Sequence, residues 1–258
     1  MSFSLKLARA GIVFGAGRGI GLAFVRSALR LNSELTLWAT YRDSKRSSGL
    51  LSLAEMYSER LKVRRVDPCD EEDLALTRDW LSSGLGTVLR KLDFVLIANG
   101  ILHNERVSPE KSLRHLNTEN LIEVFRVNSF ITPLVAKHFS SLLSRSSTSL
   151  FAALSARVGS IEDNEIGGWY GYRASKASLN MFLKTIAIEL NRSGWKTAVA
   201  AIHPGTTKTD LSKPYLGGTK YRVWEPDEAA INIINVINQL SPSADAVFKA
   251  WDGTDIPW

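Results

Sequence analysis

The stretch "VFGAGRGIGLA", residues 13–23, places four glycines between an apolar run and a helical pattern. The apolar run at 11–15 is typical of a strand buried on both faces, and residues 20–31 have the apolar spacing of a helix. Glycines at this junction permit a tight turn and let an anionic group approach the free N–H groups of the helix. The sequence therefore predicts a strand–turn–helix unit that binds the phosphates of a nucleotide.

Apolar runs and helical patterns also alternate along the rest of the chain. The predicted strands are 35–41, 61–66, 92–100, 148–155, 197–205 and 245–251, and the predicted helices are 71–85, 118–143, 170–191 and 225–240. Strands separated by helices of about ten or more residues are typical of a parallel sheet with right-handed crossovers. We expect an α/β fold with a doubly wound parallel sheet of the Rossmann type, about seven strands and helices on both faces. One dinucleotide-binding and catalytic domain over residues 1–258 is the simplest organisation, and Pro133 predicts a kink in the 118–143 helix.

The amino-acid composition argues against several classes of protein. The 258 residues are 45% hydrophobic, with one cysteine, Cys69, and no apolar run approaches the ~18 residues of a membrane span. We expect a cytoplasmic protein without a signal peptide, a membrane partner or a metal. The net charge is +6, but the densest basic stretch, 59–65, has no aromatic residues between its charges, so nucleic acid is not an expected partner. The two long helices, 118–143 and 170–191, could pair between the subunits of a homo-oligomer.

Two arginines near the glycine turn bear on the choice of cofactor. Arg18 lies within the turn, and Arg42 follows the second strand, 21 residues after Gly21. An acidic residue near this position would bind the 2′-hydroxyl of NAD, whereas a guanidinium suits a 2′-phosphate through paired hydrogen bonds. We therefore predict NADP (NADPH), with Asp43 leaving a ribose contact of the NAD type as the alternative. The predicted contacts of this region are Gly15, Arg18, Gly19, Ile20, Gly21 and Arg42.

A second motif lies at the start of the 170–191 helix. Of the two tyrosines there, only Tyr172 has a cation four residues on, Lys176, and residues four apart share one face of a helix. An ammonium favours the phenolate, so we expect Lys176 to lower the pKa of Tyr172 from its usual value near ~10. Such a pair suits proton transfer to a substrate. Tyr170 and Trp169 are then predicted to pack beside the site or to form part of its wall.

With these motifs in place, the chain resembles the short-chain dehydrogenase/reductase family, and within it the carbonyl-reductase-like branch of C-factor and sniffer-type proteins. The resemblance extends over essentially the whole length. It rests on "GAGRGIG" (15–21), "VDPCD" (66–70), "LIANG" (96–100), "VN" (127–128), "LSARVGSI" (154–161), "YRASKASLNM" (172–181), "HPGTTKTDLS" (203–212) and "WDGTDIPW" (251–258).

The resemblance implies a catalytic tetrad of Asn128, Ser155, Tyr172 and Lys176. It implies that Tyr172 donates a proton to a carbonyl oxygen while Ser155 hydrogen-bonds the same oxygen. Lys176 would adjust the pKa of Tyr172 and bind the nicotinamide ribose. Asn128 would hold a water that links Lys176 to solvent as a proton relay. The family pattern has two serines here, so in strict register Ala156 takes the catalytic place, with Ser160 as a further candidate.

The resemblance also implies further cofactor contacts. Asp67 would contact the adenine, unless it caps the helix that follows it. Asn99 and Gly100 would pack beneath the adenosine. The nicotinamide carboxamide would lie against the turn after Pro204, held by Thr207 and by Thr209, which is otherwise a helix N-cap.

The long segment 206–226 is predicted to be a substrate lid, because it contains two adjacent glycines and several aromatic residues. The loop 161–168 would line the substrate entrance. Apolar and aromatic walls favour a small hydrophobic aldehyde or ketone as the partner. The predicted function is NADPH-dependent reduction of a carbonyl to an alcohol. The alternatives are another chemistry on the same fold, such as an enoyl reductase or epimerase, and a non-enzymatic NADP-binding sensor or interaction protein.

Overall fold

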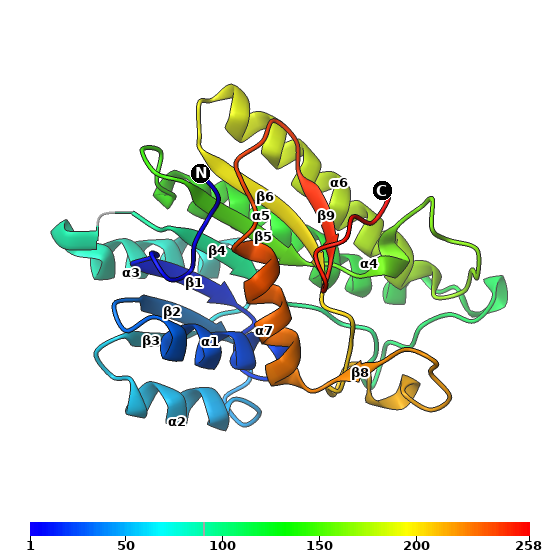
Figure 1. Ribbon diagram of the computed structural model, residues 1–258. Helices are drawn as coiled ribbons and strands as arrows, with labels where there is room; N and C mark the ends of the chain where they lie inside the picture. The colour runs from blue at the N-terminus through cyan, green and yellow to red at the C-terminus, as the bar shows by residue number, and fades with distance from the viewer. Residues whose placement is uncertain (90) are drawn as a thin grey trace.

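The computed structural model describes residues 1–89 and 91–258. Seven parallel strands form one sheet with the order β3-β2-β1-β4-β5-β6-β9 (Figure 1). The strands are β1 (Ala10–Phe14), β2 (Thr36–Tyr41), β3 (Leu61–Arg65), β4 (Phe94–Ile97), β5 (Ser149–Leu154), β6 (Thr197–His203) and β9 (Val247–Ala250). The strand order reverses between β1 and β4, and ligands of open α/β sheets bind at such a point.

Helices cover both faces of this sheet, as the alternation of elements predicted. The main helices are α1 (Gly19–Leu31), α2 (Ser48–Met56), α3 (Glu71–Leu89), α4 (Thr118–Phe125), α5 (Ile131–Phe139), α6 (Tyr170–Arg192) and α7 (Pro226–Ile237). Helices α1, α2 and α7 supply the core of one face, and α3, α5 and α6 supply the core of the other (Figure 1). The doubly wound Rossmann-type fold is therefore confirmed.

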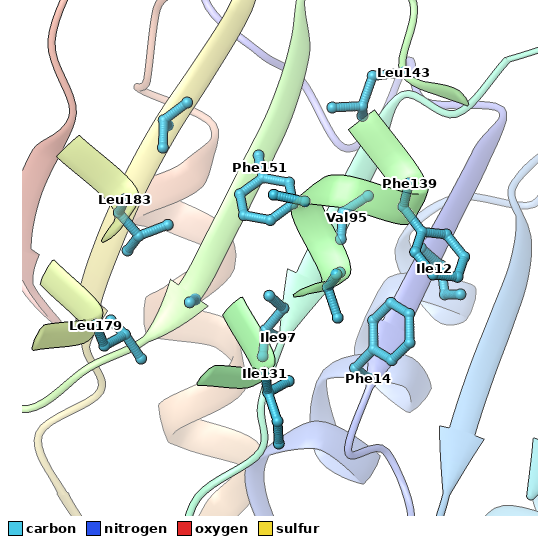
Figure 2. Packing of buried hydrophobic residues seen from close by; sticks show 14 of the residues in the cluster. Ile12, Phe14, Val95, Ile97, Ile131, Phe139, Leu143, Phe151, Leu179 and Leu183 are labelled. Carbon is cyan, nitrogen blue, oxygen red and sulfur yellow. The ribbon is translucent and has the colours of Figure 1, made fainter. Parts of the chain in front are cut away.

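Burial of β1 on both faces fixes the strand end that leads into the glycine turn. Ile12 and Phe14 point into one core, and Val13 points into the other. Phe14 packs edge-to-face on Phe139 of α5 at 5.0 Å between ring centroids (Figure 2). Each fully buried aromatic of this kind stabilises the fold by about 2–3 kcal/mol, so the turn starts from a rigid support.

The long helix predicted at 118–143 differs most from the structure. A π-helical turn, Arg126–Phe130, separates α4 from α5, and the chain ends its helical course in a short 3-10 turn at Ser140–Leu142. Pro133 lies just inside α5 and has no N–H to donate to the carbonyl of Ser129, which favours irregular helix before it. The predicted irregularity is real, but it lies ahead of the proline.

Helix α2 has no counterpart among the predicted elements. Only Leu50 and Leu53 of this helix are buried, so it carries little apolar periodicity. Ser47 precedes the helix, but its hydroxyl donates to the carbonyl of Asp43 and does not cap the first turn. In the described ranges, no helix has both the length and the apolar character needed to cross a membrane.

Candidate active site

A cleft of about 1500 Å³ opens at the carboxyl ends of the strands, where the strand order reverses. It exceeds the roughly 300–1,000 Å³ of ordinary small-molecule sites, so it has room for a dinucleotide and a substrate together. Every predicted catalytic or cofactor-binding residue lines this cleft except Asn128, which lies buried beside it. The fold therefore brings together residues that are spread over most of the sequence.

The glycine turn forms a cradle for an anionic group. Gly15 and Gly19 have left-handed φ angles of 76° and 55°, which side chains disfavour. A side-chain carbon on Gly21 would lie 2.3 Å from the carbonyl oxygen of Gly15, so only glycine lets helix α1 begin this close to β1. The first turn of α1 carries no acidic residue, and its N–H groups and dipole favour phosphate.

Asn99 supplies a further sign that a ligand belongs here. Its side-chain Oδ1 is buried and has no hydrogen-bond partner within the described part of the chain. Its backbone packs on the turn, because a side-chain carbon on Gly15 would lie 2.9 Å from Asn99 N. A buried amide oxygen without a donor is rare in folded proteins, so a hydroxyl or amine of a ligand fits beside it. The cradle and this oxygen together fit a bound dinucleotide.

The entrance to the glycine turn is basic and exposed. Arg42 follows β2 and faces solvent at the edge of the cleft. Arg18 and Arg46 both donate to Asp210 Oδ2 at 2.7 Å, although Asp210 lies far away in the sequence. Two of three guanidinium groups at this edge are thus already paired with a carboxylate. Arg46 was not predicted, although it lies four residues after Arg42.

The other predicted cofactor contacts follow β3, β4 and β6 at the carboxyl ends of these strands. Asp67 is half-buried, and its Oδ1 accepts from the N–H of Cys69 at 3.1 Å. The Thr207 hydroxyl donates to the carbonyl of Gly205 at 3.2 Å in the turn after Pro204. The carbonyl of Thr209 accepts the backbone N–H groups of Ser212 and Lys213, but Ser212 and not Thr209 is at the N-cap of the short 3-10 turn that follows.

Tyr172 and Lys176 lie one helical turn apart at the start of α6. Tyr172 is half-buried against the cleft, whereas Lys176 is 3% exposed. The Lys176 ammonium donates to the carbonyl of Leu154 at 2.8 Å and lies 6.0 Å from the centre of the Tyr172 ring. Helix geometry and the end of β5 therefore hold the amine beneath the phenol.

The pKa values of this pair differ from the sequence prediction. Burial raises the pKa of Tyr172 from 10.0 to about 12, so the expected lowering by Lys176 does not occur in this structure. Burial is the cause of this rise, and the ammonium of Lys176, which is bonded to the Leu154 carbonyl, does not offset it. Burial lowers the pKa of Lys176 from 10.5 to about 8. At neutral pH the phenol is thus protonated, and the amine titrates close to that range.

Asn128 lies in the π-helical turn between α4 and α5, an irregularity frequently found at functional sites. Its Oδ1 accepts from Ile101 N at 2.7 Å, and its Nδ2 donates to Ile101 O at 2.8 Å and to Ser175 Oγ at 3.2 Å. A side-chain carbon added at Gly100 would lie 3.6 Å from Asn128 Oδ1 and 3.9 Å from Lys176 Nζ. The amide and the amine therefore border the same small space.

Ser155 lies at the tip of β5, and its hydroxyl has a defined partner. It is 4% exposed and donates to Asn180 Oδ1 at 2.7 Å. A hydroxyl has one proton, so a carbonyl oxygen of a substrate could receive it only if this bond is given up. Ala156, the next residue, also lines the cleft but has no donor to offer. Ser160, the third candidate, is buried and donates to Trp258 O at 3.4 Å.

His203 ends β6 and also lines the cleft. Burial, with a smaller contribution from Arg157, lowers the pKa of His203 from 6.5 to about 4. The imidazole is therefore neutral at neutral pH and is a poor source of protons there. The phenol of Tyr172 keeps its proton at neutral pH and lies beside the buried amine of Lys176, so it is the better candidate for the proton donor.

Many residues of segment 206–226 line the cleft. Its ends pair as two short parallel strands, β7 (Thr206–Thr207) and β8 (Val223–Trp224). Within it, the Tyr215 ring packs edge-to-face on Trp169 at 5.2 Å, and Trp169 packs in the same way on Tyr172 at 6.1 Å. A row of aromatic rings therefore runs from the segment to the phenol. Tyr170, in contrast, is 38% exposed and does not line this cleft.

Three polar residues that support the site were missed by sequence reasoning. Asn180 lies four residues after Lys176, so the spacing that singled out Tyr172 and Lys176 also reaches it. Ser175 accepts from Asn128 and donates to the carbonyl of Tyr172. Asp210 was quoted only as part of a motif, and no local pattern points to its two arginine partners.

Seven parallel strands, a glycine cradle at the reversal point and a half-buried tyrosine beside a buried lysine together define a Rossmann-type α/β protein with a candidate active site. A sequence model of the family described as short chain dehydrogenase matches residues 9–217. The chain belongs to this family, whose members use nicotinamide cofactors.

Among curated relatives, 1-hydroxy-2-glutathionyl-2-methyl-3-butene dehydrogenase of Rhodococcus sp. (strain AD45) is 38% identical over 105 residues. That match covers 41% of this chain and spans about half of the relative, 45% of its length. Two solved structures share the fold at a TM-score of 0.84 and 97% coverage of this chain. One is the carbonyl reductase Sniffer of D. melanogaster, 22% identical over 99% of that chain. The other is the NADPH-bound carbonyl reductase from chicken fatty liver, 24% identical over 94% of that chain.

Proposed function

We propose that this protein is an NADPH-dependent carbonyl reductase that converts a hydrophobic aldehyde or ketone into an alcohol. The observation that carries the proposal is the protonated phenol of Tyr172 at the cleft, with the buried amine of Lys176 below it. When bound, NADPH supplies a hydride to the carbonyl carbon. The residues of the chain must then orient the carbonyl group and provide a proton at its oxygen.

Tyr172 is the proton donor in this proposal. With a pKa of about 12 the phenol carries its proton at neutral pH, as carbonyl reduction requires, although an ordinary phenol with a pKa near ~10 would carry it too. The basicity of the substrate oxygen rises only as the carbonyl is reduced, so the proton moves when it is needed. The same burial makes a free phenolate costly, which favours its rapid reprotonation.

In this proposal Lys176 returns a proton to the phenolate, and Asn128 holds a water that links Lys176 to solvent. With a pKa of about 8, the amine of Lys176 is mainly protonated at neutral pH and can release its proton more readily than an exposed lysine. Asn128 holds one edge of the space beside Gly100 that the amine also borders. A water held there by the amide would link the amine to solvent, and the ammonium would also bind the ribose of the nicotinamide.

Ser155 is the second donor to the carbonyl oxygen. To act, its hydroxyl must turn from Asn180 toward the substrate. Giving up a hydrogen bond of this kind costs about 1 kcal/mol, so its contribution is smaller than that of a donor already aimed at the oxygen.

We propose NADP as the cofactor, held by the glycine cradle and by the predicted contacts around it. Three guanidinium groups, of Arg18, Arg42 and Arg46, lie at the edge where the adenosine end would emerge. Arg18 and Arg46 share Asp210, so Arg42 is the group that most favours a 2′-phosphate. One structural neighbour, the carbonyl reductase from chicken fatty liver, has NADPH bound. The rest of the cleft, with its row of aromatic rings, suits an apolar substrate beneath a lid formed by 206–226.

The proposal is tested by NADPH oxidation against a panel of aldehydes and diketones. Tyr172→Phe removes only the phenolic oxygen, so we expect kcat to fall by about 10²–10⁴-fold while NADPH affinity is retained. The intact chain with NADH in place of NADPH is the cofactor control. Substantial activity in the Tyr172→Phe variant would contradict the assignment of the acid.

A second candidate function is a non-enzymatic sensor that binds NADP. It is favoured by the Ser155 hydroxyl, which is bonded to Asn180, and by Ala156 beside it, which has no donor. Tight NADPH binding without turnover across the whole panel would support this function. The same result would overturn the reductase.

A further inference from the structure

Glu110 is a buried acidic residue that none of the proposed steps uses. It lies in the long connection between β4 and α4 and is 3% exposed. All of its hydrogen bonds in the described structure go to the start of α6, where its Oε2 accepts from Gly171 N at 3.0 Å and its carbonyl accepts from Trp169 N at 2.5 Å. A single residue from a distant loop therefore holds the two N–H groups on either side of residue 170.

The fit of this carboxylate depends on the sequence of the helix. A side-chain carbon on Gly171 would lie 2.9 Å from Glu110 Oε1 and 3.1 Å from Leu121 of α4. Glycine at 171 is thus what lets the carboxylate lie against the helix. A negative charge at this end of a helix is favoured by the dipole, and its bond to N–H is charge-assisted.

The turn that precedes α6 needs such support. Residues 167, 168 and 169 all have left-handed φ angles, of 67°, 66° and 50°. Trp169 is the one non-glycine residue with a positive φ in the described ranges, and L-residues with side chains disfavour this conformation. Arg173 binds the turn from its other side, because its Nε donates to the carbonyls of Gly167 and Gly168.

This turn determines where two functional rings lie. Tyr172 is the third residue of α6, in the first turn, where N–H groups lack acceptors within the helix and ends fray. The Trp169 ring packs on Tyr172 and on Tyr215 of the 206–226 segment. Movement at the start of α6 would therefore displace both the proton donor and one wall of the substrate space.

We propose that Glu110 is a positioning residue, which fixes the first turn of α6 and so sets the places of the Tyr172 phenol and the Trp169 ring. This inference rests on the proposed function for the role of Tyr172. It adds that the wall formed by Trp169 selects flat aryl carbonyls over small aliphatic ones, and that Glu110 maintains this selection. The anchoring itself does not depend on any activity.

Hydrogen exchange on the full-length chain tests the anchoring without reference to activity. In Glu110→Ala, we expect amides at 169–173 to exchange about tenfold faster, as the loss of one charge-assisted bond implies. Glu110→Gln keeps the shape and an acceptor, so its increase should be smaller. Amides of α7 should be unchanged. Unaltered exchange at 169–173 in both variants would overturn the proposal.

Kinetics with two kinds of substrate test the proposed effect of Glu110 on the preference for aryl carbonyls. We expect Glu110→Gln to lower kcat/KM for an aryl ketone by about tenfold relative to a short aliphatic aldehyde, with NADPH affinity unchanged. In a Trp169→Ala background, the same substitution should leave this ratio constant, because the ring through which it acts is gone. Glu119→Gln, an exposed glutamate in the first turn of α4, is the matched control.

Two results distinguish failure of this inference from failure of the reductase. Faster exchange at 169–173 with no carbonyl reduction by the unaltered protein would retain the anchoring and reject the proposed function. A lower melting temperature with an unchanged substrate ratio would show that Glu110 has only a structural role, and it would overturn the positioning proposal.

Discussion

The two ends of the cleft differ in how their polar groups are held. At the α6 end, Lys176 and Asn128 are almost fully buried, and both are bonded to backbone groups at 2.7–2.8 Å. At the opposite end, Arg18, Arg46 and Asp210 form an equally short network, but their side chains are 48–60% exposed. Similar distances thus occur in two very different surroundings.

The difference shows why bond length alone does not rank these residues. Among the site residues, large pKa changes occur at the buried end, where burial acts on Tyr172 and Lys176. Exposed ion pairs contribute only about 0–1 kcal/mol each, because water and salt screen them. We therefore expect substitutions at the buried end to alter chemistry and stability strongly. Substitutions at the exposed end should alter cofactor preference modestly.

The largest effect expected beyond loss of the Tyr172 hydroxyl concerns Lys176 and pH. The unfolded amine binds its proton below pH 10.5, whereas the folded amine binds it only below a pKa of about 8. Between these values the unfolded state holds more protons, so the stability of the protein rises with pH in this window. Relative to Lys176→Met, which has no amine, the free energy of unfolding should rise by about 3 kcal/mol from pH 8 to 10.5.

Urea unfolding of both proteins at several pH values between 7 and 11 measures this difference. Lys184→Met is the matched control, because Lys184 lies on the same helix but is partly exposed and paired with Asp245 at 2.8 Å. A difference in unfolding free energy between the protein and Lys176→Met that stays constant across this pH window would contradict the prediction. The same pH dependence in Lys176→Met and Lys184→Met would also contradict it.

The contrast between buried and exposed parts of the chain also explains which elements of the fold the sequence could predict. Strands such as β1 and β5 are buried on both faces, so their continuous apolar runs were sufficient to predict them. Helix α2 covers an edge and buries only Leu50 and Leu53, which left too weak a pattern. The π-helical turn at 126–130 depends on how α4 and α5 pack on the sheet, and periodicity cannot reveal it.

Prediction of the site depended on whether its residues are neighbours in the sequence. The glycine turn and the pair Tyr172 and Lys176 are local patterns, and the structure brings them to one cleft. Glu110 reaches Gly171 across 61 positions, and such a contact leaves no local trace. The pKa of Tyr172 was predicted in the wrong direction, because sequence spacing gives the nearby charge but not the burial that outweighs it.

A smaller effect is expected at Ser155, which belongs to the buried end by location but has its proton committed to Asn180. Ser155→Ala should lower kcat by about tenfold, less than the 10²–10³-fold typical of a donor already aimed at the oxygen. Steady-state kinetics with one aryl ketone measures the change. Ala156→Ser is the matched variant, because it adds a hydroxyl at the neighbouring position of the cleft. Unchanged kcat in Ser155→Ala together with a gain in Ala156→Ser would move the donor position to residue 156.

The smallest effect is expected at the exposed end, at Arg42. This side chain faces solvent at the edge of the cleft, so its bond to a 2′-phosphate is partly screened. Arg42→Ala should reduce the preference for NADPH over NADH by about fivefold, measured as the ratio of the two dissociation constants at fixed salt. Lys45→Ala, three residues on and also exposed, should leave the ratio unchanged. A ratio insensitive to Arg42 would mean that its guanidinium does not contact the 2′-phosphate, and it would favour the alternative in which Asp43 binds a ribose hydroxyl as in NAD-dependent proteins. A loss of more than a hundredfold in Arg42→Ala would contradict the weak effect expected at the exposed end, because a screened contact cannot supply so much binding free energy.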